Sequence, residues 1–266
     1  MKNKFSIIIP TYKSKDYLDL CLYSISRVEN IKEICEVIVS CDGHYDIVKE
    51  AIDKYVDKLD LKYLNLPKVG MAKAINFAVY NAKYEHLLVI NDDNVVPLNI
   101  NTICDNINCF DYGIISFPQI EPKPSIFSCH YIEDLGETFD KFDFERFDIL
   151  TEYPNYHGDY ENLECITDNS FEPHLGTFPF LISKDSFMRS GGFDSDYNSP
   201  FVTDWDFFVK FDGNCHIKTE HYFYHFSSKS SSNPEVKQTE QQAHEYFKFK
   251  WGRYGKINND QTSYLG

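Results

Sequence analysis

Short apolar runs alternate with segments of helical periodicity along the first half of this chain. The runs at 5–9 and 87–90 predict strands that are buried on both faces, and 36–40 and 61–66 predict two further strands. The segments between them carry apolar residues every three or four positions, which predicts helices. Strands that alternate with helices in this way form a mostly parallel α/β sheet with helices on both faces.

Three helices are predicted between these four strands, and Ser14 is placed to cap the first of them. Their residues recur at helical spacing: Leu18, Cys21, Leu22 and Ile25 in the first, Ile47, Ala51, Ile52 and Tyr55 in the second, and Ala74, Phe77, Ala78 and Asn81 in the third. A helix at about 99–110 and a strand at 113–117 complete the first half.

The pattern changes after Pro118. Residues 119–175 are rich in Asp, Glu, Phe and Tyr and show neither period, which is typical of a functional loop region that faces a partner. Regular elements return beyond it: strands are expected at 177–182 and 217–226, and helices from Lys184 to the Gly191-Gly192 pair, at 202–210 and at 234–254.

Composition and charge narrow the class of protein. The chain has 266 residues, 16% of them aromatic, and a formal net charge of -15. Because nucleic acid is bound by basic surfaces, we expect no nucleic-acid partner. Eight cysteines without a C-x-x-C pair indicate reduced thiols in a cytoplasmic protein. No segment approaches the roughly 20 apolar residues of a membrane span, so we expect no transmembrane segment.

The expected C-terminal helix at 234–254 has an apolar side, which predicts packing against the rest of the domain. The residues that define this side are Ala243, Tyr246, Phe247 and Trp251. Peripheral contact with a membrane surface or a partner is the alternative, because Lys248, Lys250 and Arg253 lie nearby.

Carboxylates stand where several predicted elements begin or end. Asp92 and Asp93 follow a buried strand directly, Asp42 follows the second strand, and Asp204 opens a helix. Open α/β sheets bind ligands at the carboxyl ends of their strands. Two adjacent carboxylates repel each other. A bound divalent cation that carries phosphates would explain the Asp92-Asp93 pair, and an ordinary polar turn is the other explanation.

Several common catalytic motifs are absent from the sequence. Neither G-x-x-x-x-G-K-S/T nor G-x-G-x-x-G follows a strand, which removes the P-loop and dinucleotide-binding classes. The G-x-S-x-G and H-E-x-x-H motifs of hydrolases and zinc proteases are missing too. What remains is a set of carboxylates with His225, and such donors suit Mg²⁺ or Mn²⁺.

Six short motifs follow one another in order along about residues 5–226. They are Ser6-Ile7-Ile8-Ile9-Pro10-Thr11-Tyr12, Val39-Ser40-Cys41-Asp42-Gly43, Gly70-x-x-x-Ala74-x-Asn76, Asn91-Asp92-Asp93, Gly191-Gly192-Phe193-Asp194 and Thr203-Asp204-Trp205-Asp206. In this order they make the chain resemble family 2 of the inverting, nucleotide-sugar-dependent glycosyltransferases with the GT-A fold. The resemblance implies a GT-A-like (Rossmann-like) single domain over 1–266, with a nucleotide-sugar-binding half at 1–117 and a half for the acceptor and the catalytic base at 118–266.

The resemblance also implies roles for individual residues. Asp204 matches the family's catalytic base, and Asp93 and His225 match metal ligands for Mn²⁺ or Mg²⁺. The positions that match nucleotide-binding residues are Pro10, Thr11, Tyr12, Asp42, Gly70, Lys73, Asn76, Asn91 and Asp92. Two positions depart from the family pattern: Asn91 replaces an Asp, and Thr203 replaces a Glu, which we expect to be tolerated.

The leading hypothesis is therefore a transferase that moves a hexosyl or N-acetylhexosaminyl group, with inversion, from a UDP-linked sugar to a hydroxyl of a glycan or another acceptor. A catalytically silent relative that only binds nucleotide or glycan is the first alternative, because Asn91 brings no charge to the acidic motif. A nucleotidyltransferase is the second. It ranks last, because residues 10–14 take the place of the Gly-rich loop that such enzymes carry after the first strand.

Overall fold

The fold is described from a computed structural model of the chain. The structure describes residues 4–100, 113–123, 130–131, 135–152, 165–166, 178–211, 215–218, 222–227 and 234–253, and every structural statement below refers to these residues. The helix expected at about 99–110 lies almost entirely outside the described residues.

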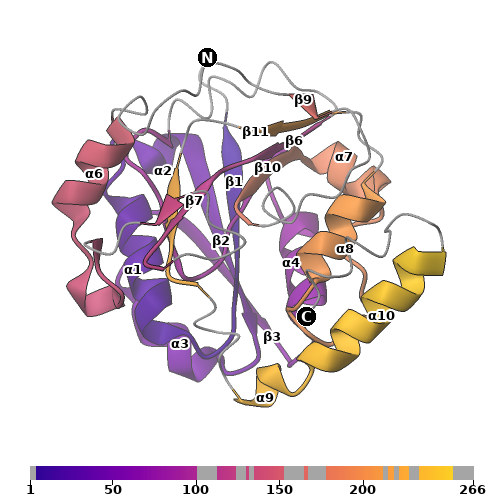
Figure 1. Cartoon of the computed structure of the whole chain (residues 1–266). Helices are drawn as coiled ribbons and strands as arrows, with labels where there is room; N and C mark the ends of the chain where they lie inside the picture. The colour runs from indigo at the N-terminus through magenta and orange to yellow at the C-terminus, as the bar shows by residue number, and fades with distance from the viewer. Residues whose placement is uncertain are drawn as a thin grey trace.

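The main sheet of the described chain has eight strands in the order β3-β2-β1-β4-β10-β6-β11-β9 (Figure 1). Their bounds are β1 Phe5–Thr11, β2 Cys35–Asp42, β3 Asp60–Leu66, β4 His86–Val89, β6 Gly113–Ser116, β9 Cys165–Ile166, β10 Phe180–Ser183 and β11 Cys215–Lys218. Neighbouring strands run parallel except at β10, which is antiparallel to β4 and β6, and at β9, which is antiparallel to β11. The predicted α/β fold with a mostly parallel sheet is confirmed.

Helices cover both faces of this sheet (Figure 1). Their bounds are α1 Lys15–Ser26, α2 Ile31–Ile34, α3 Tyr45–Asp53, α4 Met71–Tyr80, α6 Phe144–Glu152, α7 Lys184–Arg189, α8 Thr203–Lys210, α9 Pro234–Lys237 and α10 Glu240–Arg253. Side chains of β1 alternate between two cores, as the pleat of a strand requires. Ile7 and Ile9 pack with residues of α1 and α3, whereas Ile8 packs with residues of α4 and α7.

The first helix follows its predicted face but not its predicted cap. Its buried apolar residues are those expected: Leu18, Cys21, Leu22 and Ile25. Ser14 precedes the helix, but its side chain makes no capping hydrogen bond. The hydroxyl bonds to Asp92 instead. The prediction that Ser14 caps α1 is therefore wrong, because a buried carboxylate from the turn after β4 competes for the same hydroxyl.

The next two helices are rotated slightly from the predicted faces. Ile47 is 37% exposed and Phe77 is 49% exposed, so the prediction that they face the core is wrong. The buried helical residues are Val48, Ala51 and Ile52 in α3 and Ala72, Ala74, Ile75, Ala78 and Val79 in α4. Because Val48 and Ile75 also fit a helical period, the sequence pattern alone did not define which side was buried.

A second, four-stranded sheet lies beside the main one, in the order β5-β12-β7-β8. Its strands are β5 Asn94–Val95, β7 Gln119–Glu121, β8 His130–Tyr131 and β12 Phe223–His225. The predicted strand at 217–226 is wrong, because this stretch supplies β11 to the main sheet and β12 to the small one. The segment 119–175, expected to be irregular, contributes β7, β8, β9, the 3-10 helix Phe139–Lys141 and α6. His221, which the strand expected at 217–226 would carry together with His225, lies outside the described residues.

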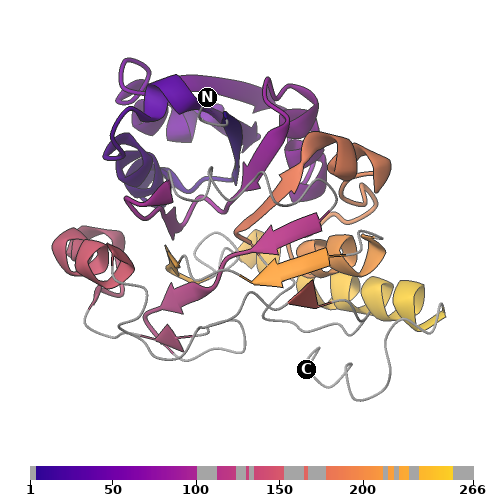
Figure 2. The same cartoon turned by 90° about the horizontal axis from the view of Figure 1, so that it is seen from above.

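The expected C-terminal helix consists of α9 and α10, and α10 lies beside α8 (Figures 1 and 2). Ala243, Phe247 and Trp251 of α10 are buried in one cluster with Val202 and Trp205. The predicted packing of this helix against the domain is confirmed. Among the described helices, α10 included, we find none with the length and apolar character needed to cross a membrane.

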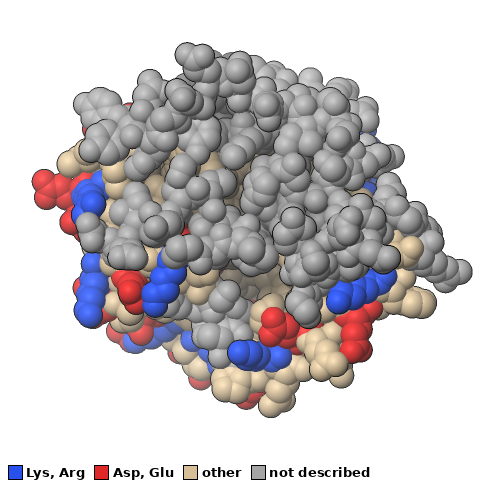
Figure 3. Space-filling model, viewed as in Figure 1, with Lys and Arg blue, Asp and Glu red and all other residues tan. Residues whose placement is uncertain are grey.

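The described charges of the acidic chain are interleaved. On the face drawn in Figure 3, lysine and arginine side chains lie beside aspartate and glutamate side chains. Lys15 pairs with Glu50 at 2.5 Å and Lys83 with Asp60 at 3.1 Å, and these four side chains are exposed. Exposed ion pairs of this kind contribute little to stability. The charged groups that bear on function are the buried ones described in the next subsection.

Candidate active site

Three strand ends bring polar residues to one edge of the main sheet. β1 lies between β2 and β4 and runs parallel to both. Thr11 pairs with Cys41 in the β1–β2 register, and Asp42 is the next residue of β2. In the β1–β4 register Ile8 pairs with Val89, so the chain leaves β4 toward Asp92 at the same edge. Parallel strands therefore gather Thr11, Asp42 and Asp92, as the sequence predicted.

A cavity of about 440 Å³ opens at this edge. Among its lining residues are eight of the nine predicted nucleotide-binding residues: Pro10, Thr11, Tyr12, Asp42, Gly70, Lys73, Asn91 and Asp92. The other lining residues, none of them among the predicted nucleotide-binding residues, are Lys68, Val69, Met71, Asn198, Pro200, Glu235, Val236 and Thr239. The wall formed by α9 and the turn after it comes from a stretch whose only sequence signal was helical amphipathicity.

Asp42 is held at the cavity by the backbone before α4. Its Oδ1 accepts hydrogen bonds from the backbone N–H groups of Val69, at 2.6 Å, and Gly70, at 3.0 Å. Gly70 has φ +90°, a value that L side chains rarely adopt, so glycine allows the turn that brings its N–H to Asp42. One carboxylate oxygen is thus occupied by the protein, which fixes the orientation of the other.

Tyr12 lies at the cavity wall within a small charged cluster. Its hydroxyl donates to Glu235 Oε2 at 2.8 Å and accepts from Lys68 Nζ at 3.1 Å. Glu235 also pairs with Lys13, at 3.3 Å, and with Lys68, at 3.7 Å. The hydrogen bond from Tyr12 and the two lysines lower the pKa of Glu235. The cluster ties α9 to the turn after β1, and both segments line the cavity.

Asn76 does not line the cavity. Its side-chain amide donates to the carbonyl oxygen of Phe193 at 2.8 Å, and its Oδ1 accepts from the N–H of Phe193 at 2.9 Å. A Cβ on Gly192 would come within 2.7 Å of Asn76 Oδ1. Asn76 therefore fastens the Gly191-Gly192-Phe193 turn to α4, and both ends of its amide are used in doing so. The structure does not place it where the predicted nucleotide contact requires.

Asp92 is a deeply buried carboxyl at the base of the cavity. It is 3% exposed, and its Oδ2 accepts a hydrogen bond from Thr11 Oγ1 at 2.7 Å. Burial and the adjacent Asp93 raise the pKa of Asp92 to about 8, although hydrogen bonds from Thr11, Ser14 and the Tyr12 backbone act against this rise. The local electrostatics therefore favour a positive group here.

The small sheet carries His225 to Asp93. β12 pairs antiparallel with β5, so His225 faces Asn94, and the N–H of Phe226 donates to the carbonyl oxygen of Asp93 at 3.2 Å. The Nε2 atom of His225 lies 3.3 Å from Asp93 Oδ1, and both side chains are largely buried. The structure therefore brings the two predicted metal ligands together, although they are far apart in the sequence.

Glu121 completes this group from β7, which runs parallel beside β12. Its Oε1 lies 2.8 Å from Nδ1 of His225, and it is 1% exposed. Burial alone would lower the pKa of His225, but Asp93 and Glu121 raise it to about 10. The sequence analysis missed Glu121, because it lies in the stretch that showed no periodicity.

The donor set fits a divalent cation. The described residues contain no group of three or more His, Cys, Asp or Glu side chains placed to hold a metal ion. Asp93 and His225 offer an oxygen and a nitrogen at one point, while Glu121 takes the other ring nitrogen, as carboxylates commonly do behind a metal-bound histidine. Two protein ligands are enough for Mg²⁺ or a similar ion that also binds substrate phosphates.

Asp204 lies on the first turn of α8 and is partly accessible. Its Oδ1 accepts a hydrogen bond from the N–H of Trp205 at 3.0 Å. Burial raises the pKa of Asp204 to about 7, and the charge of His225 acts in the opposite direction. A carboxylate with a pKa near neutrality is suited to accept a proton. Thr203, where the family has Glu, is fully buried and donates to the Ser199 carbonyl oxygen at 2.6 Å.

Comparison with known proteins agrees with this geometry. Residues 6–101 match the sequence model of "Glycosyl transferase family 2". The poly(ribitol-phosphate) beta-N-acetylglucosaminyltransferase TarS of Staphylococcus aureus is 34% identical over 95 residues, which is 35% of this chain and only 17% of TarS. Residues 6–101 include β1, β2 and β4, whose carboxyl ends border the cavity, and the chain spans a small part of TarS.

Solved structures extend the likeness over nearly the whole chain. A TarS fragment in complex with UDP-GlcNAc has a TM-score of 0.60 and 19% identity, covering 91% of this chain and 65% of that one. The mannosyltransferase PcManGT from Pyrobaculum calidifontis, in complex with GDP-Man and Mn²⁺, also has a TM-score of 0.60, with 14% identity over 97% of this chain and 66% of its own. Residues 6–101 therefore carry the sequence pattern of family 2 glycosyltransferases, and the fold of the chain is GT-A.

Proposed function

We propose that the chain transfers a sugar from a nucleoside diphosphate sugar to an acceptor hydroxyl, with inversion at the anomeric carbon. The observation that carries the proposal is the cavity at the carboxyl ends of β1, β2 and β4, with the pair of Asp93 and His225 beside Asp92 and the carboxyl of Asp204 within electrostatic reach of His225. The domain proposed is residues 1–266, with the donor held by 1–117 and the acceptor and base side formed by 118–266.

The proposed reaction is a single displacement. Asp204 takes the proton of the acceptor hydroxyl as its oxygen attacks the anomeric carbon, and the nucleoside diphosphate leaves from the opposite face. Asp93 and His225 would hold Mn²⁺ or Mg²⁺, and the ion would supply positive charge to the departing diphosphate. Glu121 holds the imidazole of His225 in orientation through Nδ1. Lys73, at the cavity wall, adds positive charge on the donor side.

A UDP-linked donor is favoured by Asp42. One oxygen of its carboxylate already accepts two backbone N–H groups, so the side chain presents an acceptor to the cavity. An acceptor selects bases with an imide N–H, such as uracil, against cytosine, whose ring nitrogen is itself an acceptor. The fold neighbour that binds UDP-GlcNAc supports the same choice, and it supports a hexosyl or N-acetylhexosaminyl group.

Calorimetric titration tests this proposal. We expect UDP to bind in the presence of Mn²⁺, CDP to bind at least tenfold more weakly, and Asp42→Asn to reduce this preference, because the amide offers a donor as well as an acceptor. A screen of UDP-sugars for metal-dependent hydrolysis then identifies the sugar. Absence of binding by every nucleoside diphosphate tested with Mn²⁺ would overturn the proposal.

Asn91 favours one second candidate, a relative that binds the donor without transferring the sugar. Asn91 lines the cavity, and its backbone N–H donates to Asn94 Oδ1 at 2.8 Å, so the turn keeps its shape without a third carboxylate. Donor binding without hydrolysis or transfer, for every sugar and acceptor tried, would favour this candidate. Transfer that disappears in Asp204→Asn would exclude it.

Glu235 is expected to matter for binding of the nucleoside rather than for turnover. Replacing Glu235 with Ala removes the acceptor that holds the hydroxyl of Tyr12, so the ring loses its fixed position at the cavity wall. We expect uridine to bind a few-fold more weakly to Glu235→Ala, and Glu235→Gln, which keeps an acceptor, to bind nearly as wild type. Titration with uridine, which carries no phosphate, separates this effect from the altered charge. Glu240→Ala is the control, and an equal loss there would contradict the assignment.

A further inference from the structure

Helix α10 contacts Val202 and Asp206, which flank Asp204 at a distance of two positions. Val202 lies two positions before Asp204 and Asp206 two positions after it. Val202 is packed in the apolar cluster that contains Phe247 and Trp251 of α10. Asp206 is fully buried and accepts hydrogen bonds from that same helix.

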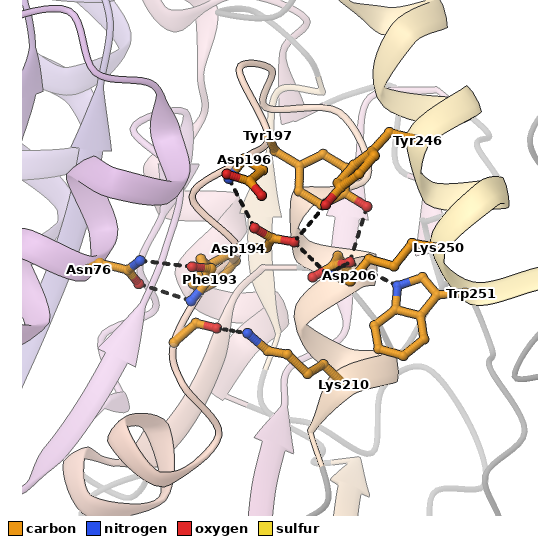
Figure 4. A network of polar contacts seen from close by, with 11 residues as sticks. Asn76, Phe193, Asp194, Asp196, Tyr197, Asp206, Lys210, Tyr246, Lys250 and Trp251 are labelled. Carbon is orange, nitrogen blue, oxygen red and sulfur yellow. Dashed lines mark hydrogen bonds and ion pairs between the residues drawn. The ribbon is translucent and has the colours of Figure 1, made fainter. Parts of the chain in front are cut away.

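Asp206 is the centre of a polar network between α8 and α10 (Figure 4). Its Oδ1 accepts from Trp251 Nε1 at 2.8 Å and from the Tyr197 hydroxyl at 3.1 Å, and it lies 2.7 Å from Lys250 Nζ. Lys250 also contacts Asp194 Oδ2 at 2.5 Å. One ammonium group therefore bridges two carboxylates, one from α8 and one from the turn after α7.

This network is held by charge. Burial opposes ionisation of Lys250, but hydrogen bonds to Asp194 and Asp206 outweigh it and raise the pKa of Lys250. Burial also opposes ionisation of Asp194, and the bond from Lys250 contributes to lowering the pKa of Asp194 all the same. A buried ion pair adds little net stability compared with apolar packing, so stability alone is a weak reason for such a network. A better explanation for the network is that it holds this part of the chain in one conformation.

The conformation that we expect the network to hold is that of the backbone at the start of α8. Val202 has φ +54°, which is a strained value for a β-branched residue. Such strain persists only where the surrounding structure enforces it. Val202 directs the chain into the first turn of α8, which carries Asp204. Residues of α10 pack against the Val202 side chain and hold it in this conformation. On the other side, Lys250 and Trp251 hold Asp206, which lies on the same helical turn as Asp204.

We propose that Lys250 and Trp251 of α10 are positioning residues for the catalytic base Asp204. This inference rests on the proposed function. It assigns α10 a part in turnover, and it accounts for Lys250 without the membrane contact considered from the sequence. The donor cavity contacts α9 and the turn after it, not Lys250 or Trp251. The two residues are therefore expected to affect the rate of transfer and not the binding of the donor.

Trp251→Phe tests this with little loss of packing, because it removes the Nε1–H donor and keeps an aromatic ring. We expect kcat to fall about 10- to 100-fold, since small displacements of a reacting group have effects of that size. The Kd of UDP with Mn²⁺ should stay within about twofold. Lys250→Met should act in the same way, and Lys250→Arg should restore part of the rate. Lys248→Met, on the same helix, is the matched control and should match wild type.

A double mutant separates positioning from a general structural effect. In an Asp204→Asn background, Trp251→Phe should cause no further loss of kcat, because residues that act through one group are not additive. Folding of each variant is checked by circular dichroism and thermal unfolding. If Lys250→Met does not fold, Trp251→Phe alone tests the positioning role. Unchanged kcat in folded Trp251→Phe, a parallel loss of donor binding, or an additive loss in the double mutant would overturn the inference. A wild-type chain without turnover would overturn the proposed function and this inference with it.

Discussion

Replacing Asp204 with Asn is expected to lower kcat for sugar transfer by about 10² to 10⁴, the usual contribution of a general base. The amide has nearly the same shape but cannot take the proton of the acceptor hydroxyl. Because Asp204 does not line the donor cavity, binding of UDP with Mn²⁺ should be unchanged. Initial rates with saturating donor and acceptor measure the effect. Asp185→Asn, which also removes an acid from the first turn of a helix, is the control and should behave as wild type.

The same residue predicts the pH dependence of the rate. The proton must be absent from Asp204 for it to act, and its pKa is raised to about 7. Log kcat of the wild type should therefore rise by about one per pH unit below pH 7 and level off above it. The acidic limb should be missing in Asp204→Asn. A limb that persists unchanged in this variant would assign the titration to another group and contradict the role of Asp204.

Asp204→Asn should also make the fold more stable at high pH. The pKa of Asp204 is higher in the folded chain, at about 7, than the roughly 3.9 of an unfolded chain, so folding favours the protonated form. The wild type therefore loses stability as the pH rises from about 4 to about 7. Asn never carries the charge, and we expect a gain of about 1–3 kcal/mol in unfolding free energy at pH 8 and none at pH 4. Urea unfolding at both values measures it.

The gathering of Thr11, Asp42 and Asp92 at one edge of the main sheet was predictable because it depends on local pattern. Thr11, Asp42 and Asp92 each follow a short apolar strand, and parallel neighbours must end at one edge of the sheet. No knowledge of distant contacts was needed to place them together. Asn76 shows the limit of the Gly70-x-x-x-Ala74-x-Asn76 motif. Its spacing fits the motif, but its side-chain amide is hydrogen-bonded to the backbone of Phe193, which lies 117 positions away in the sequence.

The surroundings of His225 depend on long-range strand pairing, which the sequence pattern does not reveal. The stretch 217–226 has the pattern of one strand, but it supplies strands to two sheets, and only the β5–β12 pairing brings His225 to Asp93. Glu121 reaches the same place through β7. The burial of Asp206 was not foreseen, because its partners Lys250 and Trp251 lie about 45 residues further on.

Removing either proposed metal ligand is expected to abolish the response of the chain to Mn²⁺. In the described part of the chain, Asp92, Asp93 and Glu121 are each at most 3% exposed, and the imidazole of His225 lies against Asp93 and Glu121. A bound cation would relieve this excess of negative charge, so Mn²⁺ should stabilise the wild type, by about 2.7 kcal/mol at 100 times its Kd. Asp93→Asn and His225→Gln should lose this stabilisation. Thermal unfolding with and without Mn²⁺ measures it independently of activity.

Glu121→Gln tests the arrangement more finely. The amide oxygen can still accept the Nδ1–H of His225, but it lacks the charge that makes the imidazole a stronger ligand. Residues that orient a metal-bound histidine typically contribute 10- to 100-fold to metal affinity, so we expect the Kd of Mn²⁺ to rise by about that factor. Titration followed by electron paramagnetic resonance of free Mn²⁺ gives the Kd directly, with Glu137→Gln as the control. If Glu121→Gln and Asp93→Asn both bound Mn²⁺ as tightly as wild type, the cation site would have to lie elsewhere, and the proposed part of His225 in holding the donor diphosphate would fall with it.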